Sequence, residues 1–205
     1  MSRARLVVAG LLLVGAPARA DDLTEVPRNR QGSYTSFGIA ASLALASEDG
    51  ETLGPINGFA ATVRTGEMLT TQFGIGFIID FGGGSGDGQS MGFGGLALAA
   101  QVEVAHNLAA HAAAGLAIVT LESPDDDPDA SSRGVSGAGY TLGVTYDWFP
   151  WQKHDKSGGW AVTPGFWVRA VPGGTDAYLM LFSVQATYWG GLPKNQQDLP
   201  PGQGY

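Results

Sequence analysis

Few side chains in this chain have the chemistry or the spacing of a catalytic or metal-binding site. There is no cysteine, and the three histidines, His106, His111 and His154, do not form the H-E-x-x-H pattern of zinc enzymes. The glycines between Gly82 and Gly88 have phosphate-loop-like spacing, but no lysine follows them. We therefore expect no catalytic residue, no metal and no cofactor.

The acidic segment Asp125–Asp129 is the best candidate for a cation site. Its carboxylates at alternate positions match the start of a calcium-binding loop: Asp125, Asp127 and Asp129. The sixth and twelfth positions of such a loop should be Gly and Glu, but here they are Ala130 and Ser136. The sequence therefore favours a solvated segment. A divalent-cation site, for example one that bridges to lipopolysaccharide, is the alternative.

Composition and charge exclude several other functions. The 205 residues fit one domain, carry a net charge of −8 and include 15% charged residues. Ordinary soluble domains have about 25% charged residues. Nucleic acid is not an expected partner, because neutralising its phosphates needs clustered Lys and Arg. The sparse charge suits a protein that faces lipid on one side.

The N-terminus has the three parts of a secretory signal peptide. Arg3 and Arg5 precede a short apolar core, Leu6–Ala16, and an A-x-A cleavage site, Ala18–Ala20, follows. A core of about 11 residues is too short to cross a bilayer as a helix, which takes roughly 20. We predict cleavage after residue 20, a lead over 21–33, a barrel over 34–190 and a disordered tail over 191–205.

The rest of the chain repeats runs of alternating apolar and polar residues. There are eight such runs, an even number as in bacterial outer-membrane barrels. Between Tyr178 and Tyr188 the apolar face has an aromatic at each end, and at about 3.3 Å per residue with a tilt near 45° it spans about the 25 Å apolar band of such barrels. The sequence therefore predicts an all-β fold, an eight-stranded antiparallel up-and-down transmembrane barrel. The residues expected in its lipid-facing aromatic girdle are Tyr140, Tyr146, Trp148, Trp160, Tyr178 and Tyr188.

Turn signals and two irregular runs complete the predicted topology. We expect a long connection over 46–55, a tight turn at Arg64–Glu67 and a Gly-rich connection over 82–90. Pro164 lies inside a run and removes one ladder donor, so a bulge or a break is expected there. The Ala-rich run Leu108–Leu121 would suit a helix by propensity. We predict a strand, because seven strands and a helix would leave an unpaired edge in lipid.

A few charged side chains fall on the polar face of the predicted strands: Arg64, Asp80, Glu103, His111, Asp147 and Arg169. If the first strand rises from the periplasm, Asp80 and Arg169 lie toward the outer end and the other four toward the periplasmic end. The interior of an eight-stranded barrel is filled by side chains, so opposite charges there should pair. We predict a lumen ion-pair network in which Arg64 pairs with Glu103 or Asp147. A proton path through His111 is the alternative.

From Tyr34 to Trp189 the chain resembles the small outer-membrane β-barrels of the OmpA transmembrane-domain and OmpX type. The resemblance rests on the signal peptide, the number of strands and the aromatic-ended run Tyr178–Tyr188. It implies a barrel inserted by the outer-membrane assembly machinery and surrounded by outer-membrane lipid and lipopolysaccharide. Such a barrel would act structurally, or through its outer connections by adhesion or surface binding. Many members end in a Phe that closes the last strand, whereas here a tail follows Trp189.

Two other functions stay open at this point. A soluble periplasmic barrel of lipocalin-like architecture would point the apolar face inward around a ligand and would need a charged outer face. The polar faces here carry mainly Gly, Ala, Ser and Thr. A lipid-modifying outer-membrane enzyme would need Ser and His on a lipid-facing strand face, but His111 has the parity of an inward residue. The oligomeric state does not follow from the sequence.

Overall fold

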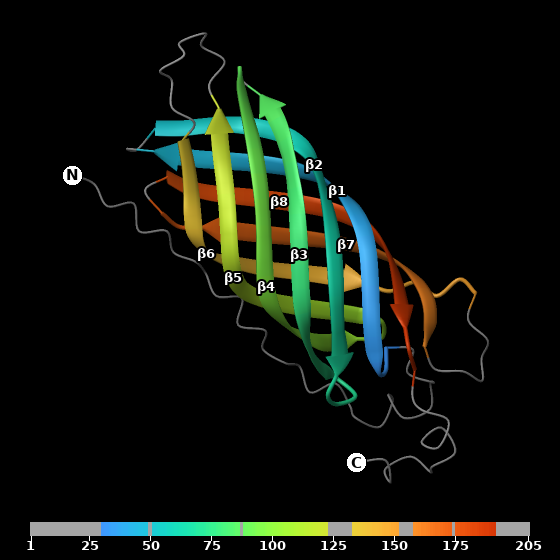
Figure 1. Cartoon of the computed structure of the whole chain (residues 1–205). Helices are drawn as coiled ribbons and strands as arrows, with labels where there is room; N and C mark the ends of the chain where they lie inside the picture. The colour runs from blue at the N-terminus through green and yellow to red at the C-terminus, as the bar shows by residue number, and fades with distance from the viewer. Residues whose placement is uncertain are drawn as a thin grey trace, which may run out of the picture.

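All eight alternating runs form strands, and the computed structural model closes them into one antiparallel barrel (Figure 1). The structure describes residues 30–48, 51–86, 88–122, 133–151, 158–173 and 175–191. None of these segments is a helix with the length and apolarity needed to span a bilayer. The strands are β1 (Ser33–Glu48), β2 (Glu51–Met68), β3 (Phe73–Gly86), β4 (Gln89–Ala105), β5 (Leu108–Glu122), β6 (Arg133–Tyr146), β7 (Gly159–Val171) and β8 (Thr175–Trp189). The predicted fold is confirmed.

Strand register gives the barrel its tilt. We call the end where β1 begins and β8 ends the terminal end, and the other the distal end. A path that starts at Gly143 on β6 and steps each time to the paired residue on the next strand goes once round the barrel and returns to β6 at Arg133. The residues on this path are Gly143, Trp167, Leu181, Ser42, Gly58, Gly84, Met91, Leu121 and Arg133. Arg133 lies on the starting strand, ten positions before Gly143. Strands with such a stagger are inclined to the barrel axis, typically by about 35–45°.

Alternation along the strands points the apolar residues outward. Ile39, Phe59 and Leu116 are 72%, 77% and 73% exposed, and every outward residue of β8 from Phe182 to Tyr188 is exposed. Among residues whose side chains the structure describes, the charged ones on the outer face lie at strand ends: Glu67, Glu122 and Asp176. A soluble barrel would have the opposite arrangement, with its apolar side chains inside.

Two connections predicted at the distal end are mostly strand. Only residues 49–50 separate β1 from β2, and only residues 87–88 separate β3 from β4. The predicted connections 46–55 and 82–90 are therefore wrong in extent. The physical reason is that the backbone N–H and C=O groups of polar residues and glycines can form hydrogen bonds in a strand ladder as well as in a loop. A longer ladder also adds backbone hydrogen bonds.

The tight turn at the other end of β2 also lies elsewhere than predicted. The ladder between β1 and β2 continues through Arg64–Glu67, and the chain turns at Leu69–Gln72. There Oγ1 of Thr70 accepts hydrogen bonds from the backbone N–H groups of Gln72, at 3.2 Å, and Phe73, at 2.9 Å. A threonine whose side chain accepts hydrogen bonds from the backbone of its own turn is a local signal, and it favours a turn at residue 70 over a turn at residue 65.

The irregularity expected at Pro164 is confirmed on one side of β7. The ladder between β6 and β7 covers Tyr140–Thr145 and Gly165–Ala170, stops opposite Pro164, and resumes in the single bridge of Trp148 with Val162. The break is local, because the register is the same on both sides of it. On the other side of β7 the ladder with β8 runs through Pro164 without a shift.

The Ala-rich run is strand β5, as predicted. It pairs with β4 along one edge and with β6 along the other, so its backbone groups are bonded on both sides. Ala113 and Ala117 point inward and are buried, while Ala112 and Ala114 are exposed on the outer face. Ladder closure thus outweighs the helical propensity of alanine.

Inward glycines make room for the large side chains of the lumen. A Cβ at Gly143 would lie 2.2 Å from the ring of Trp167, which is its ladder partner on β7. A Cβ at Gly38 would lie 2.3 Å from Cγ of Gln185, and one at Gly82 would lie 2.7 Å from the ring of Phe93. These three large lumen side chains therefore each cover a glycine on a neighbouring strand.

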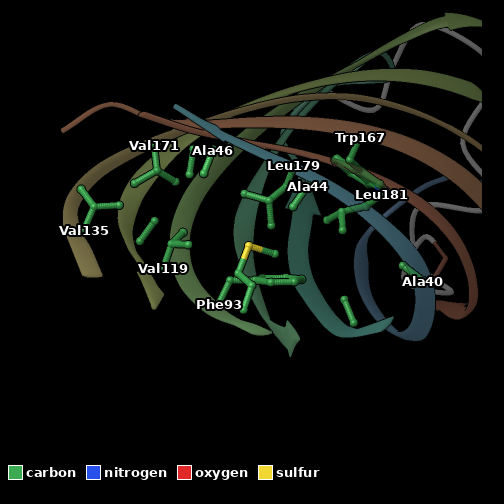
Figure 2. Packing of buried hydrophobic residues seen from close by; sticks show 14 of the residues in the cluster. Ala40, Ala44, Ala46, Phe93, Val119, Val135, Trp167, Val171, Leu179 and Leu181 are labelled. Atoms are coloured by element: carbon green, nitrogen blue, oxygen red, sulfur yellow. The ribbon is translucent and has the colours of Figure 1, made fainter. Parts of the chain in front are cut away.

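The distal half of the lumen is packed with apolar side chains. Figure 2 shows Phe93, Val119, Val135, Val171 and Leu179 pointing into the barrel from β4, β5, β6, β7 and β8. All five are buried. Side chains from opposite walls fill the space between them, as is usual for eight strands.

Gly143→Ala should destabilise the barrel, because its methyl group would overlap the Trp167 ring. Overpacking of this kind costs about 1–3 kcal/mol. The matched control is Gly137→Ala on the same strand, whose new Cβ would meet no atom closer than 3.9 Å. Denaturant unfolding of the refolded barrel, followed by tryptophan fluorescence, measures both. Equal free energies of unfolding for the two variants would contradict this account of the glycines.

Candidate functional site

The lumen changes from polar to apolar along its axis. Trp189 is the inward residue of β8 at the terminal mouth; behind it the inward residues are, in order, Thr187, Gln185, Ser183, Leu181, Leu179 and Ala177. β2 has the same order, with Arg64 and Thr62 toward the terminal end and Ala60 and Ile56 toward the distal end. The candidate site is therefore the polar, terminal half of the lumen.

A buried ion pair lies where the polar and apolar halves meet. The guanidinium of Arg169, on β7, donates from Nη1 and Nη2 to the two carboxylate oxygens of Asp80, on β3. Nε of Arg169 also donates to Oγ1 of Thr141, at 3.1 Å. Both partners are at most 4% exposed. This bidentate pair ties β3 to β7 across the lumen, with a contact to β6.

A chain of hydrogen bonds fills the terminal half. Nε of Arg64 and Oγ of Ser36 both donate to Oε1 of Gln185, each at 2.7 Å. Oγ1 of Thr187 donates to Oγ of Ser36 at 2.9 Å, and Thr187 also meets Thr163 at 2.8 Å. Oγ1 of Thr163 in turn donates to Oδ1 of Asp147 at 2.5 Å. The chain links β2, β8, β1 and β7 to the residue that follows β6.

Arg30 enters the lumen from the terminal end. Its Nε lies 2.7 Å from Oδ2 of Asp147, and its Nη2 donates to Oε1 of Gln101 at 3.3 Å. Its guanidinium carbon lies 5.0 Å from the centroid of the Trp189 ring. The side chain is 1% exposed, so Arg30 closes this end of the polar network.

The structure gives Arg64 partners other than those predicted. Among the described residues Arg64 has no carboxylate at ion-pair distance: Asp147 pairs with Arg30, and Oε1 of Glu103 accepts the backbone N–H of Asn107 at 3.0 Å. The guanidinium of Arg64 instead bonds Gln185 and lies 5.3 Å from the ring centroid of Trp167. The predicted pairing fails because Arg30, which comes from outside the strands, takes the carboxylate.

His111 points into the lumen, as its parity predicted. Its Nε2 is 2.8 Å from Oγ1 of Thr145, and its ring lies 4.9 Å from that of Trp167. Among the described residues, His111 is not part of the chain of hydrogen bonds that runs from Arg64 to Asp147. The described residues thus show a histidine held by a neutral hydroxyl and an aromatic face, and the proton path through His111 stays without a defined route.

Three groups of the polar half were not singled out from the sequence: Arg30, Gln185 and Trp167. Alternation marks Gln185 and Trp167 as inward residues, so their parity was the available signal. Arg30 precedes the first strand and has no such parity. A further pattern, Gly88–Gly92, has the G-x-S-x-G spacing of hydrolases, but Ser90 lies within β4, paired with Ser85 and Glu122, and lacks the strand-to-helix turn that exposes such a nucleophile.

The predicted girdle residues lie on the outer surface. Tyr140, Tyr146, Trp148, Trp160 and Tyr188 are exposed, and Tyr178 is half-buried. Trp160 and Tyr188 pack against each other at the terminal end, with ring centroids 5.3 Å apart. The acidic segment with Asp125, Asp127 and Asp129 lies outside the described residues, as do the predicted signal peptide and residues 192–205 of the predicted tail.

A small cavity lies between the described side chains of the lumen. A cavity of about 10 Å³ beside Asp80, Arg169 and Trp167 has room for about one water molecule. Within the described residues, no three His, Asp or Glu side chains are grouped so that they could hold a metal ion. The arrangement of these described side chains can tie strands together across the lumen.

Asp80→Leu should destabilise the barrel strongly, because it leaves the buried guanidinium of Arg169 without its carboxylate. Breaking a buried pair in this way costs about 3–5 kcal/mol. The double variant Asp80→Leu/Arg169→Met removes both charges and should recover most of that loss. Denaturant titration of the folded barrel in micelles measures both. A double variant no more stable than Asp80→Leu alone would contradict this role of the pair.

Comparison with known proteins places the fold. The chain matches no protein-family model and no curated protein sequence. Among solved structures it is similar to Ail, the attachment invasion locus protein of Yersinia pestis: 11% identity, 77% of this chain and 99% of that chain, TM-score 0.53. A second structure of Ail, in complex with the heparin analogue sucrose octasulfate, has 12% identity, the same coverage and a TM-score of 0.50. Neisserial surface protein A has 14% identity, 77% and 97% coverage and a TM-score of 0.48. This chain has the fold of the small eight-stranded outer-membrane β-barrels.

Proposed function

We propose that this protein is an integral barrel of the bacterial outer membrane that does not conduct solutes and acts through the connections at its distal end. The observation that carries the proposal is the inverted distribution of side chains. Apolar residues face outward along all eight strands, while ion pairs and hydroxyl chains lie buried in the terminal half of the lumen. In the absence of a protein partner, only a surrounding lipid bilayer would remove so much apolar surface from water.

The terminal end is the periplasmic end in this proposal. Both ends of the described chain lie there, because an even number of strands returns the chain to the side from which it started. The longest connection at the distal end, residues 123–132, fits the longer connections that such barrels have on the outer side. The distal end then faces the cell exterior, and lipopolysaccharide and outer-membrane lipids surround the band between the two ends. The assembly machinery of the outer membrane is the expected partner during insertion.

The binding activity that we propose is adhesion or surface binding. The longest connection at the distal end, residues 123–132, joins β5 to β6 and carries four aspartates. A filled lumen leaves the outer connections as the parts that can meet other molecules. The likeness to the attachment invasion locus protein supports a surface role, although it concerns the fold alone. A catalytic role is not proposed.

Val184→Arg tests the lipid environment. Val184 is 56% exposed on the outer face of β8 and pairs with Ile39 and Pro164, well inside the apolar band. Arginine at mid-membrane on a lipid-facing strand costs about 2–4 kcal/mol, but only about 0–1 kcal/mol near an interface. The control is Thr35→Arg, an outward position at the terminal end of β1.

Refolding into phospholipid vesicles and denaturant titration compare the two variants. Fractionation of cells that express the full chain, with gel migration before and after boiling, gives an independent reading. We expect a larger loss for Val184→Arg, a membrane-bound chain, and a shift of migration on boiling. Recovery in the soluble fraction, with no shift on boiling, would overturn the membrane assignment.

Replacing residues 123–132 with a Gly-Ser segment of equal length tests the surface role. We expect expressing cells to lose attachment to host-derived surfaces, while the boiling-dependent gel shift persists because the barrel is intact. The control replaces residues 152–157, which join β6 to β7 at the terminal end, and should leave attachment unchanged. Attachment that survives the first replacement would assign binding to another part of the surface.

A further inference from the structure

The groups around Arg30 form a site for a planar cation, in which Nε faces a carboxylate and Nη2 donates to an amide oxygen, while Nη1 meets no acceptor among the described residues. The groups are the carboxylate of Asp147, the amide oxygen of Gln101 on β4, and the ring face of Trp189 at the end of β8. A carboxylate, a neutral acceptor and an aromatic face are the groups that bind guanidinium best. The three come from different parts of the barrel wall and converge on one side chain.

The barrel holds these groups in place without help from Arg30. Oδ1 of Asp147 accepts a hydrogen bond from Thr163 at 2.5 Å, on the side of the carboxylate away from Arg30. The ring of Trp189 packs on that of Tyr34, with centroids 4.8 Å apart. Asp147 and Trp189 are each 1% exposed. The groups that bind the cation thus belong to the barrel, whereas Arg30, which occupies the site, lies on the segment before β1.

Arg30 reaches the site from a segment that crosses the terminal end outside the strands. The segment is tied down by its backbone: Gly191 N–H donates to the carbonyl of Gln31 at 3.0 Å, and Met68 N–H donates to that of Gly32 at 3.0 Å. These two bonds place the segment against β8 and β2. Removing the Arg30 side chain alone would leave them intact, so the site can be emptied without removing its cover.

We propose that the terminal end of the lumen is a guanidinium-binding site which Arg30 occupies in cis, as a stopper. Without Arg30, the carboxylate of Asp147 would be a buried charge with no cation at ion-pair distance among the described residues, which is strongly unfavourable. The emptied site should therefore take up a free cation. A planar guanidinium that can lie on Trp189 fits better than a compact, strongly hydrated ammonium. An arginine side chain of another polypeptide is the class of ligand that would compete with Arg30.

Chemical rescue of Arg30→Gly tests the proposal. We expect the melting temperature of the refolded variant to fall by several degrees, and millimolar methylguanidinium to restore more than half of that fall with a saturable dependence. Methylurea has a similar shape and no charge, so it should restore nothing. The wild-type barrel should not respond to either compound, because its site is full. If the variant does not refold alone, its refolding yield with and without methylguanidinium replaces the melting temperature as the measurement.

Two control variants separate the site from a general effect of charge. Arg28→Gly removes an arginine two positions earlier and should behave like the wild type. Arg30→Gly/Asp147→Asn lacks the carboxylate and should not respond to methylguanidinium. The proposal is overturned if Arg30→Gly is as stable as the wild type, if methylurea rescues equally well, if no compound rescues it, or if rescue persists in the double variant.

Discussion

Closure of the backbone ladder is the constraint on which the rest of this structure depends. Each unpaired peptide group in hydrocarbon costs several kcal/mol, so a sheet in a membrane cannot leave an edge. Fifteen residue pairs between β1 and β8 remove the last two edges. Once the ring is closed, strict alternation places every second residue inside a narrow cylinder. The interior then has to be filled, and filling it determines which residues can stand there.

Glycine and alanine solve the filling problem in this chain. Its 32 glycines are unusual for a globular protein, but several inward ones lie beneath a large side chain of a neighbouring strand, as Gly143 lies beneath Trp167 and Gly38 beneath Gln185. A large residue on one strand is thus matched by the smallest residue on the next. This pairing lets a lumen of fixed diameter hold tryptophan and arginine while the backbone stays in register.

Much of the fold could be predicted because the alternation of apolar and polar residues along a strand is local. The inward parity of Asp80, Arg64 and His111 follows from their own strands. Which inward residues meet does not, because it depends on the ten-residue stagger around the ring and on the segment before β1. Arg64 was therefore predicted to pair with a carboxylate that belongs to Arg30. The polar stretch 46–55 and the glycine-rich stretch 82–90 were misjudged for a similar reason: polarity marks solvent contact, which a strand at the rim also has.

The interruption at Pro164 makes the wall unequal around its circumference. β6 and β7 share six ladder pairs and one isolated bridge, whereas each other neighbouring pair of strands shares at least twelve within the described residues. Opening the barrel between β6 and β7 would therefore break fewer backbone hydrogen bonds than opening it between any other neighbouring pair of strands. This seam is interrupted at Pro164 and limited by the end of β7 at Val171, and it gives the described wall a preferred line of fracture.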